Sequence, residues 1–202
     1  HMSTGRINYK KSIITDKSQR LAEIAKLGEV IYHTKDLANL WQIKNANTLH
    51  TTLMRYVKRG LLFRIYRGFY SIKPISDLDP LILGAKALHD FSYVTAETVL
   101  RKEGIILQSG DRITFASPKS KKFSIGKYNY YSRKLADQYL YNPAGVNFIN
   151  GVKIANLYRA LADMLYFNSS AHFDAEKFID WKKVKKMQEA VGYPLTPERG
   201  SR

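Results

Sequence analysis

The sequence lacks several residue patterns that whole classes of protein require. None of its 202 residues is cysteine, which excludes disulfide bonds, thiolate zinc sites and a cysteine nucleophile. It contains no signal peptide and no apolar run long enough to span a membrane, so we expect a cytoplasmic protein without a membrane partner. Acidic residues are scarce, with 17 aspartates and glutamates against 33 lysines and arginines and a net charge of +16. This excess of positive charge favours nucleic acid or another anionic partner.

The residue sets that enzymes and metal sites use are also missing. The five histidines lack the spacing of metal ligands, and the glycines are isolated rather than grouped in a phosphate-binding loop. Ser92 and Ser117 have no histidine and acid that the sequence can place beside them. Asp163 follows Arg159 by four residues in a predicted helix, where we expect a structural ion pair rather than a catalytic carboxylate. The sequence therefore predicts no enzyme, no catalytic residue, no metal and no cofactor.

Residues 34–58 carry the pattern of two short amphipathic helices joined by a polar turn. Thr34 can cap the first helix, and Asn45 can cap the second, which we expect to end near Lys58, before Gly60. The second helix has an apolar stripe that we expect to be buried, formed by Leu49, Leu53, Tyr56 and Val57. This arrangement is typical of a helix-turn-helix.

The opposite face of the second helix is small, polar and basic. Two short strands are predicted after it, over 61–65 and 69–72, with Arg67 and Gly68 in the turn between them. Side chains on such a helix can reach base edges in the major groove, and a basic hairpin can lie along the phosphates. The residues that we expect to contact DNA are Lys44, Asn45, Asn47, Thr48, Thr51, Thr52, Arg55, Lys58, Arg59, Arg64 and Arg67. The alternative is a small packed core with no role in DNA binding.

The positive charge is concentrated on the part of the chain that carries this pattern. Residues 1–73 contain 14 of the basic and 4 of the acidic residues, a net charge of +10, which leaves +6 for the rest of the chain. Concentrated positive charge is what neutralisation of DNA phosphates requires. The two prolines of residues 73–80 predict a boundary between a DNA-binding domain over 18–73 and a second domain over 80–191. Residues 3–17 are predicted to be a flexible basic arm, and residues 18–27 a helix that packs under the helix-turn-helix through Leu21, Ile24 and Leu27.

We expect the second domain to mix helices with strands, which makes the fold class α+β: an N-terminal winged helix-turn-helix followed by a mixed α/β domain. Helices are predicted over 80–88, over 95–102, from Asn156 onward and over 174–191, the last with Phe178, Trp181, Val184, Met187 and Val191 facing inward. Strands are predicted over 91–94, 113–116, 122–125, 128–133 and 151–154, with the middle three consecutive in a meander.

Two basic features of the second domain leave alternatives open. Residues 119–134 mix lysines with tyrosines, a composition that can stack or clamp nucleic acid but that also suits a hairpin with a solvated turn. Four lysines lie on the outer face of the last predicted helix, where a solvated face is the favoured interpretation: Lys182, Lys183, Lys185 and Lys186.

A series of short motifs extends over about residues 20–170. They include Thr34 to Leu37, the helix segment Thr52 to Gly60, the arginine-glycine-aromatic piece Tyr66 to Tyr70, the strand Asp111 to Thr114 and the helix core Arg159 to Asp163. In this order they resemble the AbiEi-type antitoxins of bacterial abortive-infection toxin–antitoxin systems, a phage-defence function.

The resemblance implies a two-domain antitoxin of type IV behaviour. Its N-terminal winged helix would bind repeats in promoter DNA and act as a repressor of its own operon, and we expect a monomer that binds these repeats cooperatively. Its C-terminal antitoxin domain would counteract a nucleotidyltransferase-like toxin without forming a stable complex with it. Three alternatives stay open: a stand-alone winged-helix transcriptional regulator, a nuclease targeted by a DNA-binding domain, and an antitoxin that binds its toxin directly.

Overall fold

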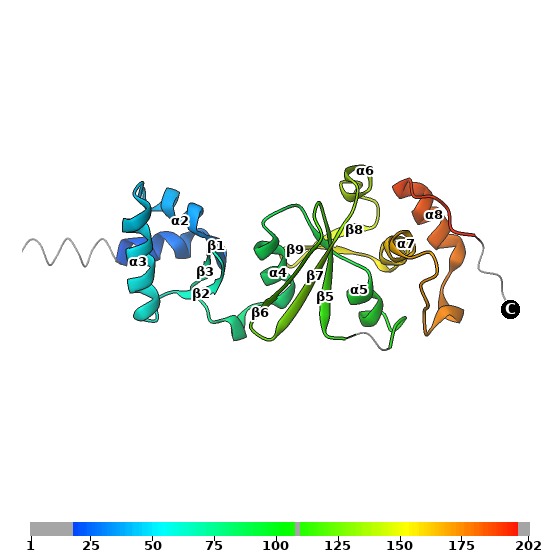
Figure 1. Ribbon diagram of the computed structural model, residues 1–202, viewed down its shortest axis with the longest axis horizontal. Helices are drawn as coiled ribbons and strands as arrows, with labels where there is room; N and C mark the ends of the chain where they lie inside the picture. Colours follow the sequence, from blue (N-terminus) through cyan, green and yellow to red (C-terminus); the bar gives the residue numbers. More distant parts are fainter. Residues whose placement is uncertain (1–17, 108–109, 198–202) are drawn as a thin grey trace, which may run out of the picture. The chain divides into compact units, whose positions relative to one another are not determined.

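The computed structural model describes residues 18–107 and 110–197, and the chain is mixed α+β, as predicted (Figure 1). It divides into two compact units, His1–Leu78 and Asp79–Arg202. The division falls inside the proline-containing segment 73–80. The arm predicted over 3–17 lies outside the described residues.

Over residues 18–78 the first unit combines three α-helices with a small antiparallel sheet. A helix over residues 18–26 precedes β1 (Ile31–His33), α2 (Thr34–Leu40) and α3 (Ala46–Lys58). The chain then forms β2 (Phe63–Tyr66), β3 (Phe69–Ser71) and the short 3-10 helix η1 (Ile75–Asp77). The three strands pair in the order β1-β3-β2, so the sheet joins the hairpin to the strand that precedes α2.

The predicted apolar stripe of α3 lies in the core of this unit. Leu49, Leu53 and Tyr56 are buried, and Val57 packs half-buried against the same cluster. The Tyr56 ring lies edge-on to Trp41 at a centroid distance of 5.6 Å. Each helix therefore contributes apolar side chains to one shared core, which fixes the outward direction of the opposite face of α3.

Two sequence-based expectations for this unit were wrong. The cap of α2 is His33 rather than Thr34, because the His33 ring accepts a hydrogen bond from the Lys35 amide while Asp36 accepts one from the His33 amide. Leu27 was expected on the buried stripe of the first helix but is 52% exposed. That helix ends at residue 26, so the periodicity of the stripe no longer applies to the next residue.

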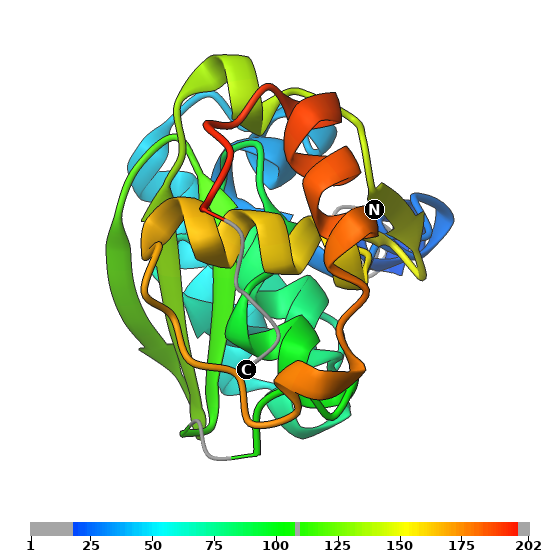
Figure 2. The same cartoon turned by 90° about the vertical axis from the view of Figure 1, so that its right-hand side faces the viewer.

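The second unit contains a six-stranded mixed sheet with helices on both faces (Figure 2). Its strands are β4 (Tyr93–Val94), β5 (Arg112–Ser117), β6 (Lys121–Ile125), β7 (Tyr128–Lys134), β8 (Val146–Ile149) and β9 (Val152–Ala155). Its helices are α4 (Pro80–Leu88), α5 (Glu97–Lys102), α6 (Asp137–Leu140), α7 (Leu157–Phe167), η2 (Glu176–Phe178) and α8 (Trp181–Val191).

The sheet order β6-β7-β5-β4-β9-β8 shows that the predicted meander was wrong. β7 lies between β5 and β6, parallel to β5 and antiparallel to β6. The Ser117 and Ser132 hydroxyls lie 2.8 Å from the Lys119 carbonyl oxygen and hydrogen-bond to each other, so that one hydroxyl donates to the other and the second donates to the carbonyl. These bonds hold the β5–β6 connection beside the end of β7. The chain then forms β6 at the edge of the sheet.

The two faces of the sheet carry different helices. On one face Gly84 of α4 lies so close to the rings of Phe115 and Tyr130 that an added Cβ would come within 2.4 Å of Tyr130. On the other face α5 and α7 cover part of the sheet, and α8 packs against α7 (Figure 2). The prediction of α4 is confirmed at both ends, with Asp79 as its cap, and Asn156 caps α7 as expected.

The last helix is shorter than predicted. Asp180 accepts hydrogen bonds from the amides of Lys182 and Lys183, so α8 begins at Trp181 rather than near residue 174. Phe178, expected to face inward, is 74% exposed in the separate turn η2. An N-cap interrupts the helical register, and the residues before it no longer share the buried face. Strand β8 and helix α6 were not predicted.

A fully buried polar network joins β4 to α7 in the second unit. Asp163 accepts from Tyr93 and Thr95 through one carboxylate oxygen, at 2.9 and 2.7 Å, and from Arg159 and Tyr193 through the other, at 2.9 and 2.6 Å. The side chains of Arg159 and Asp163 are both 0% exposed. The predicted structural ion pair is confirmed. Burial, reinforced by the charge of Asp163, raises the pKa of the Tyr93 and Tyr193 phenols, so both remain protonated donors.

Arg159 uses all five of its N–H donors inside this network. Beyond Asp163, its guanidinium donates to the Tyr93 hydroxyl at 2.8 Å. Its remaining donors reach three backbone carbonyls at 2.7 to 2.9 Å, those of Tyr139, Asn142 and Ala144. The planar guanidinium of Arg159 thus links the loop around α6 to the sheet, a geometry that a lysine ammonium cannot reproduce.

No helix in the described ranges is long and apolar enough to cross a membrane.

Candidate nucleic-acid interface

The first turn of α3 is held by its own cap, as predicted. The Asn45 side-chain oxygen accepts hydrogen bonds from the Thr48 amide at 3.0 Å and from the Thr48 hydroxyl at 3.3 Å. Asn45 and Thr48, both predicted to contact DNA, are therefore exposed but already engaged with each other. Their arrangement fixes the start of the helix while both residues remain exposed.

One exposed face of α3 gathers most of the predicted contact residues. Asn47, Thr51, Arg55 and Lys58 are all exposed, at spacings of three or four residues that place them in line along the helix. Neither Arg55 nor Lys58 has an ion-pair partner in the described part of the chain. Both cations are thus available to phosphates or base edges.

Thr52 does not belong to this face, and its assignment to the contact set is corrected. It is only 2% exposed, and its hydroxyl donates to the Thr48 carbonyl at 2.8 Å. The cause is helical geometry: Thr52 lies three residues after Leu49 and four before Tyr56, on the buried side. Sequence reasoning classified it by its polarity, although its hydroxyl is satisfied within the helix.

Met54 was missed by sequence reasoning because it is apolar, yet it is 44% exposed. Its position, three residues after Thr51 and four before Lys58, places it on the exposed face. The signal that identifies it is this spacing rather than its chemistry. An exposed methyl thioether among polar side chains can contact the thymine methyl group in the major groove.

The β2–β3 hairpin is fixed against the start of α2. The Gly68 carbonyl accepts from the Thr34 amide at 2.8 Å and from the Thr34 hydroxyl at 2.9 Å. Gly68 has a positive φ of 71°, which the turn requires and which glycine adopts without strain. Arg64 and Arg67 are both exposed on this hairpin. Their backbone is therefore anchored while their guanidinium groups extend into solvent.

The first unit thus exposes six of the cationic residues that are predicted to contact DNA. They lie before, on and after α3 and on the hairpin: Lys44, Arg55, Lys58, Arg59, Arg64 and Arg67. No acidic residue occurs between residues 37 and 76. A surface of this kind has a positive potential that attracts the DNA backbone.

For the two basic features of the second unit, a nucleic-acid contact and a solvated surface both stay open. On the β6–β7 hairpin, Lys121 lies 5.0 Å from the Phe123 ring centroid and Lys127 lies 5.5 Å from that of Tyr128. On α8 all four lysines are exposed, and Lys183 lies 3.8 Å from its capping residue Asp180. These contacts within the chain are compatible with solvated side chains and with a nucleic-acid surface.

No group of three or more histidines, aspartates or glutamates is placed to hold a metal ion among residues 18–107 and 110–197. Comparison with family models and with curated proteins finds no match for this chain.

Proposed function

We propose that the first unit is a winged helix-turn-helix and that the chain binds double-stranded DNA at its own promoter. The order helix, β1, α2, α3, β2, β3 makes α3 the recognition helix and the β2–β3 hairpin the wing. The observation that carries the proposal is the polar and basic face of α3, exposed beside an anchored hairpin that presents Arg64 and Arg67. Asn47 and Arg55 would read bases, and the wing arginines would hold phosphates.

We further propose that this DNA binding represses the operon of a toxin–antitoxin system, in which the chain is the antitoxin. The support is the ordered series of motifs that resembles AbiEi-type antitoxins, together with a separate second unit that has its own sheet and buried network. That unit would counteract a nucleotidyltransferase-like toxin without a stable complex.

Arg55 and Arg67 are expected to have different effects on DNA binding. Arg55→Ala should weaken binding to the promoter by about 1–3 kcal/mol and relax the preference over a scrambled duplex, because a base contact is lost. Arg67→Ala should weaken binding to both duplexes alike, because a phosphate contact carries no sequence information. Fluorescence anisotropy with both duplexes measures the two effects.

Lys86→Ala, on α4 of the second unit, is the control. Lys86→Ala should leave the promoter preference unchanged. The assigned roles are reversed if Arg67→Ala alters the preference while Arg55→Ala does not. Equal affinity of the unaltered chain for promoter and scrambled DNA rejects the repressor proposal.

Repression and toxin rescue are expected to be separable. A variant with Arg55→Ala and Arg67→Ala should lose repression of a promoter–reporter fusion, yet it should still rescue cells from the toxin when expressed from a foreign promoter. The reason is that both substitutions lie in the first unit, whereas the proposed rescue role lies in residues 80–191. Loss of rescue by a variant that accumulates to normal levels would contradict this division.

A further inference from the structure

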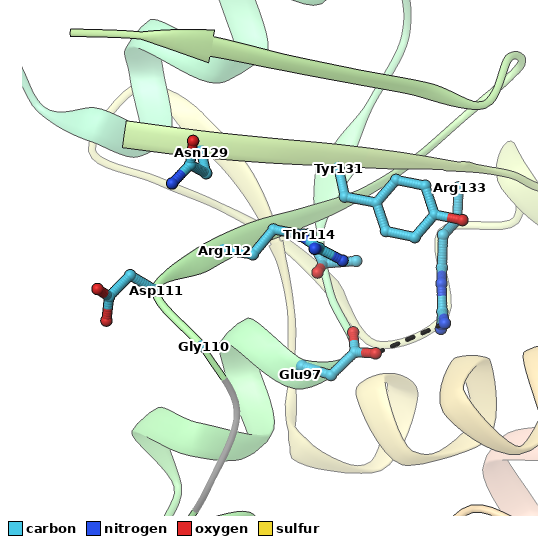
Figure 3. Close-up of a pocket in the computed structure, with 8 residues that line it drawn as sticks. All are labelled: Glu97, Gly110, Asp111, Arg112, Thr114, Asn129, Tyr131 and Arg133. Carbon is cyan, nitrogen blue, oxygen red and sulfur yellow. Dashed lines mark ion pairs between the residues drawn. The ribbon is translucent and has the colours of Figure 1, made fainter. Parts of the chain in front are cut away.

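A polar hollow of about 400 Å³ lies on the second unit, on the face of the sheet that carries α5 (Figure 3). Parallel pairing of β5 with β7 places Arg112 beside Asn129 and Thr114 beside Tyr131. Glu97, in the first turn of α5, lies across from these strands. The volume is at the lower end of the range for small-molecule sites, which suits a ligand the size of a mononucleotide.

Two cations beside this hollow form no ion pair in the described part of the chain, although the carboxylates of Glu97 and Asp111 also line it. The Arg112 guanidinium lies 5.5 Å from the centroid of the Tyr131 ring, and the Lys122 ammonium lies 5.2 Å from the same centroid. Neither side-chain cation has an ion-pair or hydrogen-bond partner in the ranges that the structure describes. Two free positive charges match a phosphomonoester, which carries close to two negative charges at neutral pH.

A third cation in the hollow is held in place. Arg133 lies 3.6 Å from one carboxylate oxygen of Glu97 and 4.8 Å from the centroid of the Phe167 ring. The other Glu97 oxygen is buried and has no hydrogen-bond partner in the described part of the chain. An unpaired buried acceptor is costly, and a ligand N–H that reaches this carboxylate would remove the cost.

We propose that this hollow binds a nucleoside 5′-monophosphate. Arg112 and Lys122 bind the phosphate, the Tyr131 ring stacks on the base, and Glu97 accepts a hydrogen bond from the base or the ribose. The ligand is either a free nucleotide or the phosphorylated 5′ end of a strand, since both present the same group. This site is separate from the α3 surface and does not depend on the proposed repressor function.

The test is calorimetric titration of the full chain with each of the four ribonucleoside 5′-monophosphates and with inorganic phosphate. Arg112→Gln should weaken binding of the best nucleotide by roughly 10- to 100-fold, because a charge-assisted contact is lost. Tyr131→Leu should weaken nucleotide binding by roughly tenfold or more but leave phosphate binding unchanged. Lys177→Gln, which removes the same charge from an exposed position in η2, is the control and should bind normally.

A second arm compares hexanucleotides with a 5′-phosphate and a 5′-hydroxyl. Binding of the free monophosphates, or a 5′-phosphate-dependent binding of the strand, supports the site and identifies its source of ligand. The proposal is overturned if inorganic phosphate binds as tightly as every nucleotide, or if neither monophosphate nor 5′-phosphorylated strand binds. It is also overturned if Arg112→Gln and Lys177→Gln weaken binding equally.

Discussion

Replacing Arg159 by methionine is expected to lower the free energy of unfolding of the second unit by about 3–5 kcal/mol. The substitution leaves the Asp163 carboxylate fully buried without its cation, and it removes the donors of three backbone carbonyls around α6. Methionine fills much of the volume but has no N–H, so the loss arises from unpaired polar groups rather than from a cavity. Few single substitutions in this unit should cost as much.

Tryptophan fluorescence can separate this loss from the stability of the first unit. The two tryptophans are Trp41 in the first unit and Trp181 in the second, where it lies 6.2 Å from the Phe173 ring centroid. In a Trp41→Phe background the remaining signal reports on unfolding of the second unit alone. Urea titration of this background with and without Arg159→Met gives the difference in unfolding free energy.

Two further variants control the interpretation. Lys182→Met removes an exposed cation from α8 and should change stability by no more than about 0.5 kcal/mol. Arg159→Lys keeps the charge but offers three donors instead of five, so a substantial part of the loss should remain. Equal stability of the Arg159→Met and Lys182→Met variants would contradict the structural role of the network.

The elements of the first unit were predictable because their signals are local. The Asn45 cap, the stripe of Leu49, Leu53 and Tyr56, and the turn at Gly68 each depend on residues close together in the sequence. The error at Thr52 shows the limit of this reasoning. A polar residue can be satisfied inside its own helix, and the spacing of Thr52 from Leu49 and Tyr56, rather than its polarity, indicates the side on which it lies.

The arrangement of the second unit depends on pairing between distant strands, which periodicity does not encode. The segments of β5, β6 and β7 were recognised, yet their order was not, because the same alternation fits a meander and the observed parallel pairing of β5 with β7. The hollow beside Tyr131 follows directly from that pairing. Arg112, Lys122 and Glu97 come from three different elements, so no spacing in the sequence could bring them together.

The proposed binding of the chain to its promoter is expected to fall by roughly three orders of magnitude between about 50 and 200 mM salt. The first unit exposes six cations in its proposed interface, namely Lys44, Arg55, Lys58, Arg59, Arg64 and Arg67. If the five other than Arg55, which is assigned to a base, each neutralise one phosphate, the slope of log affinity against log salt is about −4.5, since each contact contributes about −0.9. Anisotropy titrations at four or five salt concentrations measure this slope. A steeper slope would show that cations outside this set also contact the DNA.

Substitutions that remove wing cations should change the slope, whereas a neutral substitution should change only the affinity. The pair Arg64→Ala and Arg67→Ala removes two phosphate contacts, so the slope should become shallower by about 1.8. The Thr51 hydroxyl carries no charge, so its contact with DNA releases no counterion. Thr51→Ala should therefore leave the slope unchanged even if it weakens binding. The double variant and Thr51→Ala therefore separate the electrostatic contribution of the wing from base recognition by α3. A slope near zero for the unaltered chain would reject phosphate neutralisation by this surface, and an unchanged slope in the double variant would place the wing outside the interface.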